Sequence, residues 1–103
     1  MTIRSPFQPH FGSNQNPSPA AASATITIGR GDKTLRVRNT GTINVMYFRT
    51  GIAADATVTA TDTDVPVYPG EVVYIEKPQD HDTVATISAA GTTASVMSGE
   101  GGF

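Results

Sequence analysis

The chain has 103 residues, a length typical of one domain, and 38% of its residues are hydrophobic. A formal net charge of −2 argues against nucleic-acid binding, which usually requires a basic surface. The absence of cysteine excludes disulfides and thiolate metal sites, and no apolar run approaches the roughly 20 residues that cross a bilayer. Fifteen threonines, with glycines and prolines spread along the chain, favour many short β-strands joined by turns.

Residues 1–22 differ from the rest of the chain, because they hold four of its seven prolines and a polar Gly-Ser-Asn-Gln-Asn stretch. Proline fixes φ and has no N–H donor, so an extended segment without a regular hydrogen-bond ladder is expected here. Three large apolar side chains, those of Ile3, Phe7 and Phe11, lie in this otherwise polar segment. Two interpretations are open: a disordered terminus, or an arm that lies along a neighbouring subunit with these side chains as anchors.

From residue 23 onward polar and apolar residues alternate, which predicts strands. In the second strand Leu35 and Val37 are expected to point inward, and Arg36 and Arg38 outward, near Arg49 of the following strand. Residues 51–65 are expected to form an irregular loop that contains one further short strand. The other expected strands cover residues 24–28, 34–38, 42–50, 71–77, 83–88 and 93–98.

The strand expected over residues 42–50 carries apolar side chains on both faces, which indicates a central strand or a face covered by a partner. Its two faces carry, respectively, Ile43, Val45 and Tyr47, and Asn44, Met46 and Phe48. Turn signals recur about every eight to twelve residues, a spacing typical of an antiparallel sandwich or barrel. We therefore predict an all-β fold, a small antiparallel β-sandwich or barrel of six to seven short strands. An extended N-terminal arm, residues 1–22, precedes this domain of residues 23–98, and a flexible tail, residues 99–103, follows it.

No set of residues in the sequence predicts catalysis. His81 lies between Asp80 and Asp82, which is similar to a metal or acid–base cluster, but ordinary turn chemistry explains the same pattern. Asp55, Asp62 and Asp64 could offer oxygen ligands to calcium, yet the residues between and directly after them lack the glycine and glutamate of a helix-loop-helix calcium site. We expect no enzymatic activity, no cofactor and no bound metal.

Arg36 and Arg38 are the charged residues that the pattern places on one outward strand face. They could belong to a solvated face or protect an edge strand from pairing. They could equally contact acidic groups on a partner, and both interpretations remain open.

Three stretches resemble small head proteins of tailed bacteriophages, of the capsid-decoration or cement type. These stretches are VRNTGTINVMYFRTG, VPVYPGEVVYI and VATISAAGTTASVMSGEGGF, within residues 35–103. The resemblance covers about two-thirds of the chain, leaves out the arm and rests mainly on turn residues. It implies a β-sandwich protein of the virion, and no catalytic residue is carried over.

On this basis we expect a structural virion protein that binds and stabilises a phage capsid, with the arm contacting neighbouring subunits. The expected partners are the major capsid protein and further copies of the chain, with no nucleic acid and no membrane. The expected location is the capsid surface, after synthesis in the host cytoplasm. The candidate partner-binding residues are Ile3, Phe7, Phe11, Arg36 and Arg38. The alternatives are a head–tail connector or tail component, or a carbohydrate- or host-binding β-sandwich module.

Overall fold

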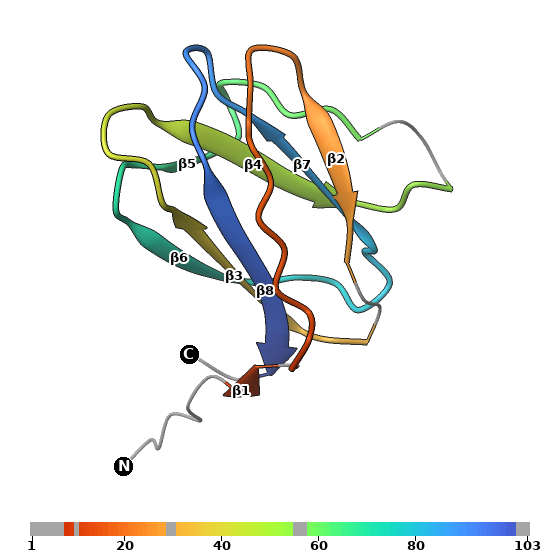
Figure 1. Cartoon of the computed structure of the whole chain (residues 1–103). Helices are drawn as coiled ribbons and strands as arrows, with labels where there is room; N and C mark the ends of the chain where they lie inside the picture. Colours follow the sequence, from red (N-terminus) through yellow and green to blue (C-terminus); the bar gives the residue numbers. More distant parts are fainter. Residues whose placement is uncertain (1–7, 10, 29–30, 55–57, 101–103) are drawn as a thin grey trace.

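The computed structural model describes residues 8–9, 11–28, 31–54 and 58–100, and these form an all-β fold, as predicted (Figure 1). Two antiparallel four-stranded sheets are present, with the orders β1-β8-β3-β6 and β2-β7-β4-β5. Seven strands have three or more residues, and β1 has two. The strands are β1 (Gln8–Pro9), β2 (Ala24–Thr27), β3 (Thr34–Asn39), β4 (Met46–Gly51), β5 (Val65–Val67), β6 (Val72–Glu76), β7 (Thr83–Ile87) and β8 (Ala94–Glu100).

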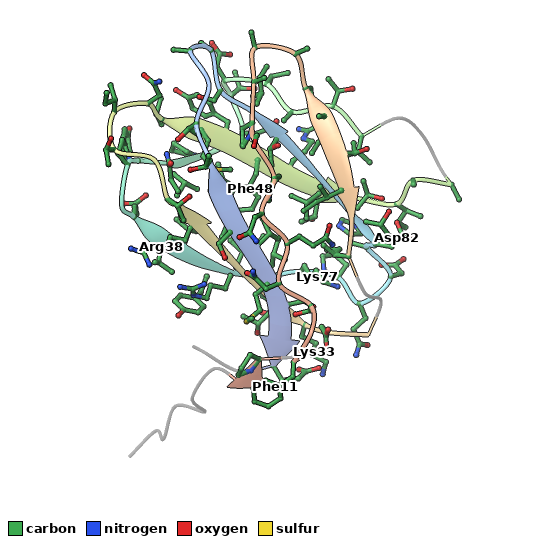
Figure 2. The ribbon with its side chains drawn as sticks, viewed as in Figure 1. Phe11, Lys33, Arg38, Phe48, Lys77 and Asp82 are labelled. Carbon is green, nitrogen blue, oxygen red and sulfur yellow. The ribbon has the colours of Figure 1, made fainter. Side chains whose placement is uncertain are left out.

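The hydrophobic core lies between the two sheets and is supplied by alternate residues of the strands. Leu35 and Val37 of β3 are fully buried, which confirms their predicted inward orientation. Met46 and Phe48 of β4 are also fully buried in this cluster, and Figure 2 shows Phe48 between the sheets. Burying a side chain of this size stabilises a fold by about 1.5–3 kcal/mol. The period of two in the sequence therefore identified the core face of β3, whereas for β4 both faces were apolar and the sequence did not indicate which one is buried.

The strand expected over residues 42–50 begins only at Met46, so this prediction is wrong for its first half. The preceding residues carry the chain from β3 in one sheet to β4 in the other. The Nδ2 of Asn44 donates to the carbonyl of Gly91 (2.7 Å), and the Asn44 carbonyl accepts from Nδ2 of Asn39 (2.8 Å). These side-chain bonds replace a strand ladder, an alternative that asparagine commonly offers the backbone.

Residues 13–20, here called the N-terminal segment, run antiparallel along β8 of the same chain. Gln15 and Val96 exchange two backbone hydrogen bonds of 2.8 Å. The amides of Ala94, Thr92 and Ser88 then donate to the carbonyls of Pro17, Pro19 and Ala20, at 3.0, 3.0 and 2.9 Å. Proline lacks a donor but keeps its acceptor, and the margin of a sheet is the place where this one-sided pairing is tolerated.

The N-terminal segment also links the two sheets. The side-chain amide of Gln15 donates to the carbonyl of Thr27 on β2, which belongs to the other sheet. Pro19 is fully buried. This part of the predicted arm is therefore bound to its own domain, where it covers the edge of β8.

Candidate functional site

The described residues include three of the five candidate partner-binding residues, and Ile3 and Phe7 lie outside them. Phe11 lies in the turn between β1 and the N-terminal segment, whereas Arg36 and Arg38 lie on β3. Figure 2 shows Phe11 beside β1 and Arg38 on the side of β6, well apart in that view. The structure thus presents two separate surfaces rather than one joint site.

Phe11 is exposed by an interruption of the pairing with β8. Pro9 pairs with Gly99 of β8, and Gln15 pairs with Val96. These two pairs are six residues apart on the N-terminal side but only three residues apart on β8. The extra residues form a turn in which Gly12 has a φ of 85°, a backbone conformation that other residues rarely adopt. As a result the Phe11 side chain is 87% exposed.

The two β3 arginines lie on the outer face of their sheet, among apolar side chains. The register places Arg36 beside Tyr74 of β6 and Met97 of β8, and Arg38 beside Val72. Val72 and Tyr74 are 36% and 42% exposed, Arg38 is exposed and Arg36 is half-buried. We call these five residues the arginine patch.

The arginine patch carries the positive charge of two arginines. Within the described ranges neither arginine forms an ion pair with a carboxylate, although Arg49 does so with Asp64, at 2.8 Å between Nη2 and Oδ1. The expectation that Arg49 would lie near the other two arginines is wrong, since β4 belongs to the opposite sheet. Arg49 is separated from Arg36 and Arg38 because the chain crosses from one sheet to the other between β3 and β4.

A second surface feature is a groove of about 400 Å³ on the opposite sheet, here called the Tyr47 groove. Its lining includes Tyr47 of β4, Ile87 of β7 and Asp62, together with three alanines, Ala21, Ala60 and Ala89. Tyr47 and Ile87 are direct cross-strand partners. The groove could not be predicted from the sequence, because its lining comes from four separate parts of the chain. The one indication of the groove in the sequence was that the strand expected over residues 42–50 carries apolar side chains on both faces, with Tyr47 on one of them.

The predicted Asp80-His81-Asp82 turn does not bring its side chains to a common point. Nδ1 of His81 lies 2.8 Å from the hydroxyl of Thr50. Oδ1 of Asp82 accepts from the amide of Ala53 at 3.1 Å, and the His81 amide closes the turn onto a backbone carbonyl. Across the part of the chain that the structure describes, no group of three or more His, Asp or Glu side chains is arranged to hold a metal ion.

Lys77 is the one described cation that lies inside the sandwich. It is 2% exposed, and its Nζ donates to the carbonyl of His81 at 3.1 Å. Burial lowers the pKa of Lys77 below its ordinary value of 10.5, and nearby carboxylates oppose this shift in part. These carboxylates are those of Asp32, Glu100, Asp80 and Asp82.

The stability of the protein is expected to depend on pH through Lys77. Because the folded pKa lies below 10.5, the unfolded chain binds more protons in the interval between the two values. The free energy of unfolding should therefore rise with pH across that interval, relative to a Lys77→Met variant that keeps the apolar stem. Urea unfolding of both proteins from pH 7 to pH 11 measures this. A constant difference between them would contradict the burial argument.

Comparison with known proteins adds no family assignment: no protein-family model matches the chain, and no curated protein matches it either. Within residues 8–9, 11–28, 31–54 and 58–100 there is no helix that could cross a membrane.

Proposed function

We propose that this protein is a structural component of a tailed-bacteriophage particle, one that binds the outer surface of the capsid and stabilises it. The resemblance of residues 35–103 to capsid-decoration proteins suggests the assembly. The arginine patch is the observation that carries the proposal. Arginine and tyrosine are enriched among residues that dominate protein–protein binding, and here they lie beside exposed apolar side chains.

In this proposal the patch docks on carboxylate-rich surface of the major capsid protein. A protein that binds the assembled shell but not its dissociated subunits favours assembly by mass action. Symmetric self-association of the chain would let several patches engage the lattice together, which raises the overall affinity. Phe11 supplies a further apolar contact, and Ile3 and Phe7, expected from the sequence to belong to the arm, extend that contact to neighbouring subunits.

A single charge removal in the patch tests this proposal. Arg38→Ser should weaken binding about tenfold, since an arginine at the centre of an interface commonly contributes more than 1 kcal/mol. Lys33→Ser is the matched control, because Lys33 is exposed, lies outside the patch and carries the same charge. Co-sedimentation with shells assembled from the cognate major capsid protein measures both affinities.

Equal weakening by Arg38→Ser and Lys33→Ser would contradict the patch as the docking surface, since only net charge would then matter. The number of copies per particle, from quantitative electrophoresis, tests the capsid role itself. On the order of hundreds of copies is expected for decoration of an icosahedral lattice. About a dozen copies would assign the protein to a head–tail connector or the tail instead.

A further inference from the structure

The Tyr47 groove is built from small side chains around one aromatic ring. Tyr47 of β4 and Ile87 of β7 are cross-strand partners, and both line the groove together with three alanines, whose side chains occupy little space. Its volume of about 400 Å³ lies in the lower part of the range for small-ligand sites, about 300–1,000 Å³. An occupant of this groove is therefore the size of one long side chain or one sugar ring.

The wall of the groove that carries Asp62 is held in place by its neighbours. The carboxylate of Asp64 accepts from the amide of Thr61 at 2.8 Å and pairs with Arg49, whose Nε lies 3.0 Å away. On the other side of the wall, the amide of Ala60 donates to the hydroxyl of Ser23 at 2.9 Å. A wall fixed in this way loses little conformational entropy when a ligand binds.

The charge in the described lining of the groove is negative. Asp62 is the one acidic side chain in its lining, and within the described residues it has no hydrogen bond or ion pair. The nearby cation Arg49 is already engaged by Asp64. An uncompensated carboxylate beside an aromatic ring and apolar walls is complementary to a cation with flat apolar faces.

We infer that the Tyr47 groove binds the side chain of an arginine residue of a partner protein. The planar guanidinium stacks on the ring of Tyr47 and donates hydrogen bonds to the carboxylate of Asp62. Arginine suits this arrangement better than lysine, because its planar fork combines stacking with paired hydrogen bonds and is more weakly hydrated. This contact lies on the sheet opposite to the arginine patch, and it is independent of capsid binding through that patch.

The test uses the intact chain and a minimal probe, N-acetyl-arginine amide, in ¹⁵N-edited NMR titrations at millimolar concentration. The amide signals of Tyr47, Asp62 and Ile87 should shift with the probe. The neutral isostere N-acetyl-citrulline amide should shift them at least fivefold less at equal concentration. Asp62→Asn, which keeps the shape of the side chain and removes its charge, should weaken arginine binding at least fivefold.

Glu76→Gln on β6 is the matched control, since it removes one exposed carboxylate on the other sheet and should leave the binding of the arginine probe unchanged. Equal shifts with the arginine and citrulline probes would overturn the proposal, because Asp62 would then play no electrostatic role. Shifts of the groove signals with methyl glucoside or methyl galactoside, without shifts from arginine, would also overturn it and indicate a sugar site.

Discussion

Replacing Asn39 by alanine is expected to lower the free energy of unfolding by about 3 kcal/mol, since each buried polar group left without a partner costs about 1–3 kcal/mol. Asn39 is the last residue of β3 and is fully buried. Its Nδ2 donates to the carbonyls of Asn44 (2.8 Å) and Val67 (3.0 Å). Its Oδ1 accepts from the amide of Gly41 (3.0 Å) and the hydroxyl of Thr92 (2.8 Å). The four hydrogen bonds of this side chain therefore join the end of β3 to the loop that follows it, to β5 and to the turn before β8.

Urea unfolding followed by circular dichroism measures this loss. Asn44→Ala is the matched control, because it removes an asparagine from the same end of the sandwich whose side chain makes one hydrogen bond, to Gly91. Its expected cost is about 1 kcal/mol. A loss in Asn39→Ala no larger than that in Asn44→Ala would show that the four contacts do not act together.

Deletion of residues 1–22 is expected to lower the free energy of unfolding by about 5 kcal/mol, at about 1 kcal/mol for each of the five backbone hydrogen bonds lost. The deletion removes the bonds from Gln15, Pro17, Pro19 and Ala20 to the rest of the chain, and the buried Pro19 ring. It also leaves the edge of β8 open, and an open edge favours association of strands from different molecules. Thermal unfolding, with light scattering to detect aggregation, measures both effects.

Deletion of residues 1–12 is the control for this experiment, since it removes the two-residue strand β1 and the Phe11 turn but keeps the N-terminal segment. Its stability should remain close to that of the full chain. This shorter deletion, together with Phe11→Ser, is also the appropriate variant for capsid-binding assays, because loss of binding after removal of residues 1–22 could reflect damage to the sandwich. Equal stability of the two deletions would contradict the structural role of the N-terminal segment.

The fold class and part of the core could be predicted from the amino-acid sequence alone. Alternation with a period of two predicts which side of a strand faces the core, because successive side chains of a strand point to opposite faces. This alternation correctly placed Leu35 and Val37 in the core. The many threonines, glycines and prolines of the sequence indicated short strands and turns. The outward face with Arg36 and Arg38 was predicted by the same argument, and these residues lie on that face of β3.

The order of the strands in the two sheets could not be predicted from the sequence. This order sets which side chains lie together in the arginine patch and in the Tyr47 groove. Alternation along one strand carries no information about its partners, because pairing joins residues far apart in the chain. For this reason the sequence could not show that Arg49 lies on the other sheet, or that Tyr47 and Asp62 line one groove. The burial of Asn39 and Lys77 also depends on contacts made across the sandwich. The N-terminal segment can pair along β8 although proline has no N–H donor, because the carbonyls of Pro17 and Pro19 still accept hydrogen bonds from the amides of Ala94 and Thr92.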